Sequence, residues 1–227
     1  MNDELGPAIA AVHASTTPHG GPVGAADLHT IARTRLHLAQ STLGDELRYR
    51  TALILALARD GQPEEATVSA EDAIAAAEAM AVVDTGELVD LFAAAAEAYA
   101  TAGWPRRSAE LAYRALSYAD ALGQDERVFR ARSLLAVSLA LKGEYAGAIA
   151  HARVCRQLAH RNSWGTQVFV YPLILGEILI ASARLDGAAL LTLVRELRDA
   201  LGDDPLWAAT ADSAEGMALL ILSLIHI

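Results

Sequence analysis

The sequence is poor in cysteine and shows no export signal. Its one cysteine, Cys155, cannot form an internal disulfide, so the fold does not depend on an oxidising compartment. Near the N-terminus, acidic Asp3 and Glu4 stand where a signal peptide would be basic, and Gly6 and Pro7 interrupt the apolar stretch. We therefore expect a cytoplasmic protein.

Positive charge is also scarce. The chain has 18 basic residues, of which Lys142 is the only lysine, and 28 acidic residues, so its net charge is -10. Such a chain has no electrostatic attraction to phosphate backbones or anionic lipids, so we expect no nucleic acid to bind this segment and no membrane contact. The apolar stretch 207–227 contains Asp212 and Glu215, which are costly inside a bilayer, and a core helix explains it better.

Large aromatic side chains are rare in a chain that is otherwise rich in apolar residues. Only three phenylalanines occur, although 53% of the residues are hydrophobic and 49 are alanine. Helices made of such residues pack closely on small side chains. This composition favours many thin helix contacts over one thick core.

Four positions recur along the chain in the order small, large apolar, glycine, small. The clearest copy lies in the string AVSLALKGEYAGAIAHA. The turn positions are spaced by 42, 40 and 40 residues, and a step of 40 from Gly176, the first small residue of the last copy, leads to Gly216. The four copies are Ile54, Leu57, Gly61 and Ala66; Ala96, Tyr99, Gly103 and Ser108; Ala136, Leu139, Gly143 and Ala148; and Gly176, Leu179, Ala183 and Ala188, where alanine replaces the turn glycine.

Each copy predicts a helical hairpin. The glycine takes the left-handed conformation and reverses the chain, while the small residues lie where the paired helices cross. One hairpin cannot bury its apolar face, so neighbours stack. The predicted fold is all-α: a right-handed superhelical solenoid of antiparallel helix hairpins with a period of about 40. The expected pairs are 45–60 with 63–82, 86–102 with 105–122, 125–142 with 145–161, and 170–184 with 186–201.

The two ends are less regular than the middle. Residues 1–24 are predicted to be an irregular N-terminal segment, and 25–206 the repeat domain, which opens with a capping helix. Residues 207–227 are predicted to be the first helix of an incomplete further repeat, so we expect a truncated C-terminus. The last six residues, 222–227, resemble translated sequencing-adapter sequence and carry no functional argument.

Several strings resemble tetratricopeptide repeats. GEYAGAIAHA and GQPEEATVSAEDAI resemble the starts of second helices, and LGEILIASARLDGAALL resembles a diverged copy. The period exceeds the usual 34 and resembles the longer hairpins in the sensor region of large LuxR-type transcription regulators of the maltose-regulator kind. That resemblance implies an ATPase module before the array and a helix-turn-helix domain after it, and the sequence contains neither.

Chemistry-bearing motifs are missing. There is no phosphate loop of the form GxxxxGKS or GxxxxGKT and no GxSxG nucleophile turn. His151 and Cys155 have the spacing of two ligands on a helix, but two ligands make no metal site, and a buried thiol is the better reading. Glu97 and Glu177 lie two repeats apart, too far for joint acid–base work. We expect no catalytic residue, metal or cofactor.

A binding surface would lie on the first helices of the pairs, which line the concave side of a tetratricopeptide superhelix. An ordinary solvated face is the equal alternative. Trp164, Phe169 and Tyr171 would mark a hot spot if exposed, although core packing between the third and fourth pairs is favoured. The candidate groove residues are Arg48, Thr51, Asp90, Glu97, Arg130, Ser133, Val170, Leu173 and Glu177.

The sequence thus predicts a binding scaffold and leaves three functions open. The first is the sensor or oligomerisation region of a LuxR-type regulator, whose partner is a protein, a peptide or a small-molecule inducer and which could self-associate. The second is a free-standing adaptor that bridges other proteins. An all-α enzyme is the least favoured, because titratable residues do not converge.

Overall fold

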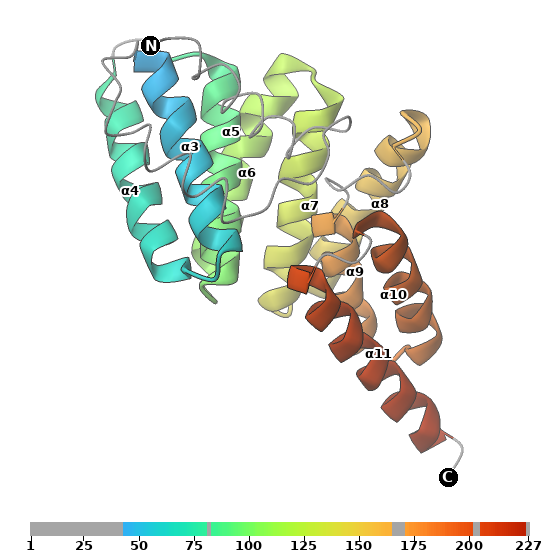
Figure 1. Ribbon diagram of the computed structural model, residues 1–227. Helices are drawn as coiled ribbons and strands as arrows, with labels where there is room; N and C mark the ends of the chain where they lie inside the picture. Colours follow the sequence, from blue (N-terminus) through green and yellow to red (C-terminus); the bar gives the residue numbers. More distant parts are fainter. Residues whose placement is uncertain (1–42, 81–82, 165–170, 202–204, 226–227) are drawn as a thin grey trace.

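The structure is a computed structural model that describes residues 43–80, 83–164, 171–201 and 205–225, and in this part of the chain every regular element is a helix. The predicted N-terminal segment and capping helix lie outside the described residues, and Figure 1 traces the helices in order along the array. They are α3 (Leu43–Arg59), α4 (Pro63–Ala79), α5 (Thr85–Thr101), α6 (Pro105–Leu122), α7 (Asp125–Leu141), α8 (Tyr145–Arg161), α9 (Tyr171–Ala183), α10 (Gly187–Leu201) and α11 (Pro205–Ile225).

These helices form the stacked hairpins that the repeat predicts. The pairs α3/α4, α5/α6, α7/α8 and α9/α10 each pack side by side, and α11 packs on α10. The first helices α3, α5, α7 and α9 also contact one another in sequence, so each hairpin leans on the next. The all-α helical solenoid is confirmed, and the helix boundaries match the expected ones to within three residues.

Local signals in the sequence explain where most helices begin and end. Gly61, Gly103 and Gly143 turn the chain between paired helices with φ of 73°, 77° and 80°, a region that side chains avoid. Pro105 opens α6 at a position where a missing amide proton costs nothing. Asp84 caps α5 by accepting from the backbone N–H groups of residues 86 and 87.

The fourth copy of the repeat follows a different register from the one predicted. Ala183 is the last residue of α9 and not the bend, because the left-handed residue of this turn is Leu185, with φ 54°. Leu190, five residues beyond the bend, is fully buried like Ala66 and Ala148, whereas the predicted Ala188 is exposed. The predicted turn at 183 is therefore wrong by two residues.

Alanine packing builds the centre of the array, as the composition indicates. Residues 93–96 of α5 are all 0% exposed, so this helix is enclosed on every side at its middle. Its small side chains let the neighbouring helices approach closely at this point. Ser108 of α6 is buried there too; it donates to the carbonyl of Ala96 at 2.7 Å and lies 2.6 Å from the Ser138 hydroxyl of α7.

Glycine sets the junction between the third and fourth hairpins. A Cβ on Gly176 of α9 would lie 3.2 Å from both the Ala136 Cβ and the Val137 backbone nitrogen of α7. The sequence predicted a close crossing at Gly176, but with its own hairpin partner, whereas the structure places the preceding first helix there. As a result α9 lies directly on α7.

The C-terminal helix α11 carries several exposed apolar side chains, including Met217, Leu220 and Leu224. Its Asp212 and Glu215 both accept from Arg198 of α10, at 2.9 and 2.8 Å. Among the described helices, none is both long enough and apolar enough to cross a membrane.

Candidate functional site

Ion pairs join the first helices into a row. Arg48 of α3 contacts Glu87 of α5 at 2.9 Å, and Arg127 of α7 contacts Asp90 of α5 at 2.8 Å. These pairs link residues almost one repeat apart, because equivalent turns of neighbouring first helices lie at similar heights in a stack. The row thus carries charges of both signs along α3, α5 and α7.

Glu97 is the most enclosed charge of this row. It is 8% exposed and meets Arg59 of α3 at 3.3 Å and Arg130 of α7 at 3.9 Å. Burial, followed by the negative charge of Glu97, raises the pKa of Tyr171 at the start of α9. Four first helices therefore contribute to one electrostatic neighbourhood around a single carboxylate.

The structure divides the predicted groove residues into two groups. Four of them, Thr51, Glu97, Ser133 and Leu173, are buried, and Ser133 donates to its own helix at the carbonyl of residue 130. The other described members remain at least partly exposed, and Val170 lies outside the described residues. The accessible candidates of the row are Arg48, Asp90 and Arg130, and their role in binding stays a prediction.

Glu177 does not belong to this row. Counted back from the bend of its own hairpin, Glu177 corresponds to Leu135 of α7. Glu97 corresponds to Val137, so the two glutamates occupy different positions of the repeat. A shift of two residues turns a side chain by about 200° around the helix axis. Glu177 therefore faces the second helices α8 and α10, on the far side of α9 from the predicted groove.

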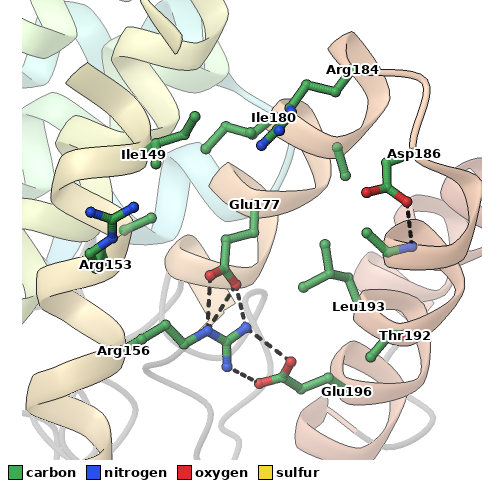
Figure 2. Close-up of a pocket in the computed structure, with 13 residues that line it drawn as sticks. Ile149, Arg153, Arg156, Glu177, Ile180, Arg184, Asp186, Thr192, Leu193 and Glu196 are labelled. Atoms are coloured by element: carbon green, nitrogen blue, oxygen red, sulfur yellow. Dashed lines mark hydrogen bonds and ion pairs between the residues drawn. The ribbon is translucent and has the colours of Figure 1, made fainter. Parts of the chain in front are cut away.

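A pocket of about 490 Å³ opens where Glu177 points. It lies between α8, α9 and α10, and Figure 2 shows side chains from all three helices turned into it. This site was not predicted from the sequence, because its position depends on α9 packing against α7 and leaving α8 and α10 apart. Its walls are Ile149, Ala152, Arg153, Arg156, Glu177, Ile180, Ala181, Arg184, Asp186, Ala189, Thr192, Leu193 and Glu196.

One arginine spans the pocket. Arg156 of α8 donates through Nε to both carboxylate oxygens of Glu177, at 2.9 and 3.0 Å, and through Nη2 to Glu196 Oε2 at 2.9 Å. Arg156 has two anionic partners, which hold its pKa above the usual range against the opposing effect of burial. Glu177 and Glu196 share this one guanidinium. Burial raises the pKa of Glu177 and the negative charge of Glu196 adds to the rise, whereas Arg156 lowers the pKa.

The two residues with ligand spacing do not form a metal site. Cys155 is buried, its thiol lies 3.5 Å from the Phe129 carbonyl, and burial raises its pKa to about 12. His151 is half-buried beside Arg132, and burial and that positive charge lower its pKa. No group of three potential ligands occurs within the residues that the structure describes. The prediction of a buried thiol is confirmed.

Two aromatic side chains of the predicted cluster pack against the protein core. Trp164 meets Phe129 of α7 edge to face, with ring centroids 5.3 Å apart, and belongs with Tyr171 to the partly buried side chains around the C-terminal core. This arrangement confirms the favoured reading for these two residues. Phe169 lies outside the described residues.

Comparisons with known proteins reveal likeness in fold. No protein-family model matches the sequence, and no curated protein matches it significantly. The crystal structure of PlcR from Bacillus thuringiensis in complex with the peptide PapR7 and DNA matches with a TM-score of 0.56 and 13% identity, over 99% of this chain and 70% of PlcR. The structure of BtubC from P. vanneervenii matches with a TM-score of 0.54 and 14% identity, over 98% of this chain and 92% of BtubC. At these identities the likeness shows a shared helical fold.

Proposed function

We propose that this chain is the helical sensor or oligomerisation region of a bacterial transcription regulator of LuxR type, and that it acts by binding a protein or peptide partner. The observation that carries the proposal is the row of first helices, which places charges of both signs at repeat intervals along α3, α5 and α7. PlcR supports it, because PlcR has a similar helical fold and its structure is a complex with a peptide and DNA. In this proposal the chain itself catalyses nothing.

The partner contacts the accessible charges of the row, Arg48, Asp90 and Arg130. Their side chains are 48%, 24% and 17% exposed, so a peptide could reach them without unfolding the array. Paired charges of both signs select a partner of alternating charge more by orientation than by net attraction. The buried members of the predicted groove support the row from beneath.

The test is a peptide selection on the purified chain, followed by affinity measurements on matched variants. Arg48→Ala removes an accessible charge from α3. Arg195→Ala removes one from the exposed side of α10, where the guanidinium donates to the Leu191 carbonyl of its own helix and forms no ion pair within the described residues. We expect Arg48→Ala to weaken the selected peptides about tenfold, as loss of a charge-assisted contact does, and Arg195→Ala to leave them unchanged. Equal affinity for both variants, with hydrogen-exchange protection confined to second helices, would contradict the proposed face.

A second candidate is a free-standing adaptor that bridges other proteins. The likeness to BtubC favours it, because the shared fold spans 92% of that chain, so an array of this size can make up most of a protein. Reading the genomic locus separates the two candidates. A helix-turn-helix in the same reading frame supports the regulator, whereas a short polar ending supports the adaptor.

A further inference from the structure

The pocket between α8, α9 and α10 has the size and lining of a small-ligand site. Its volume of about 490 Å³ falls within the range of about 300–1,000 Å³ that is usual for such sites. Ile149, Ile180 and Leu193 supply its apolar walls, and Figure 2 shows Ile149 of α8 and Ile180 of α9 next to each other on one side of it. An apolar body of modest size would therefore leave water on entering.

Charge is distributed unevenly along the pocket. At one end a single guanidinium, that of Arg156, serves two carboxylates, Glu177 and Glu196, so this end carries a net negative charge. The carboxylates are 20% and 27% exposed and have lone pairs left to accept from a ligand. This end favours a cationic donor such as an ammonium group.

The opposite end favours an anion. Arg184 lines the pocket there, and its guanidinium has no hydrogen-bond or ion-pair partner within the described part of the chain. The nearby carboxylate of Asp186 caps α10, where it accepts from the Ala189 N–H at 3.0 Å, and among the described residues it forms no ion pair with Arg184. In Figure 2 Arg184 lies at the end of α9 that is remote from the Arg156 bridge. Its guanidinium is free to bind a carboxylate.

The distance between the two ends fixes the length of the ligand. Glu177 and Arg184 are seven residues apart along one helix and its last turn, which corresponds to about 10 Å. Three extended residues of a peptide span about the same distance. From this match we infer that the pocket binds a short apolar peptide of about three residues with free termini, its ammonium group on Glu177 and Glu196 and its carboxylate on Arg184. This site is separate from the row of first helices and does not depend on what binds there.

Isothermal titration of the full chain with leucyl-alanyl-leucine tests the inference. We expect a dissociation constant on the order of tens of micromolar, the affinity typical of ligands of this size. The N-acetylated and the C-amidated peptides should each bind at least about tenfold more weakly, because each loses one charged end. Decanoate, which has the apolar body and the carboxylate but no ammonium group, should also bind more weakly.

Variants assign the two ends. Arg184→Ala should weaken binding of the free peptide about tenfold and leave the affinity for the C-amidated peptide unchanged. Glu196→Gln should weaken binding of the free peptide about tenfold and leave the affinity for the N-acetylated peptide unchanged. Arg195→Ala, on the same helix as Glu196 but outside the pocket, is the control and should change nothing. The inference is overturned if the free peptide does not bind at millimolar concentration, if capping either end leaves the affinity unchanged, or if decanoate binds as tightly.

Discussion

Because α9 approaches α7 closely, we predict that alanine substitution has opposite effects on stability at two helical glycines, although helix propensity alone predicts the same effect at both. Both Gly176 and Gly216 lie inside helices, where replacing glycine with alanine ordinarily stabilises a protein by about 1 kcal/mol. At Gly216 the added methyl group would meet nothing within 4 Å. We expect Gly216→Ala to raise the free energy of unfolding by about 1 kcal/mol.

At Gly176 the same methyl group would lie 3.2 Å from the Ala136 Cβ and 3.2 Å from a backbone nitrogen of α7. Backbone cannot rotate away as the end of a flexible side chain can, so one helix must move. Overpacking of this kind costs about 1–3 kcal/mol, which exceeds or cancels the gain in helix propensity. We expect Gly176→Ala to lower the free energy of unfolding by up to about 2 kcal/mol.

Urea unfolding followed by circular dichroism measures both variants against the parent chain. The decisive quantity is the difference between the variants, which should be about 1–3 kcal/mol in favour of Gly216→Ala. Gly176→Val should be less stable still, since a branched side chain needs more room at the same crossing. If Gly176→Ala proved as stable as Gly216→Ala, α7 and α9 would not be in close contact at this point. The pocket between α8, α9 and α10 would then not have the described form, because it depends on that contact.

Three further outcomes follow. Gly143→Ala should cost about 1 kcal/mol because φ is 80° there, and Leu185→Gly should gain a similar amount at φ 54°; thermal unfolding compares them. Cys155, with a pKa of about 12, should react with a thiol reagent at pH 8 only after unfolding, and rapid labelling of the native chain would contradict its burial. The pKa of Glu177 is raised above its ordinary value of 4.5, so its contribution to stability is present below that value and is lost as pH rises through the folded pKa. The stability advantage of the parent chain over Glu177→Gln should therefore shrink as pH rises, and a constant difference would refute this.

The sequence allowed the helices and three of the four bends to be predicted, because their causes are local. Gly61, Gly103 and Gly143 each reverse the chain within a few residues of their own position, and proline opens α6 by its own geometry. The fourth bend was predicted wrongly because no glycine marks it. Leu185 takes the left-handed conformation there without any signal in its own chemistry, and only the burial of Leu190 discloses the register.

The candidate sites were much less predictable. The row of first helices could be expected from periodicity, but not the burial of Thr51 and Ser133, which depends on everything packed around α3 and α7. The pocket could not be found at all. Arg156 and Glu196 occupy ordinary positions on the helices α8 and α10, and only their convergence on Glu177 gives them a shared role.

The sequence alone thus determined that this chain is a stack of helical hairpins with a period of about 40, since helix starts, helix ends and close crossings are specified by residues near one another in the chain. The tertiary structure alone decided which way each helix faces. A shift of two residues, invisible to any local rule, turns α9 by about 200° and sends Glu177 to the side opposite Glu97. In this orientation Gly176 lies against Ala136, forty residues earlier in the chain, a contact that no local pattern specifies.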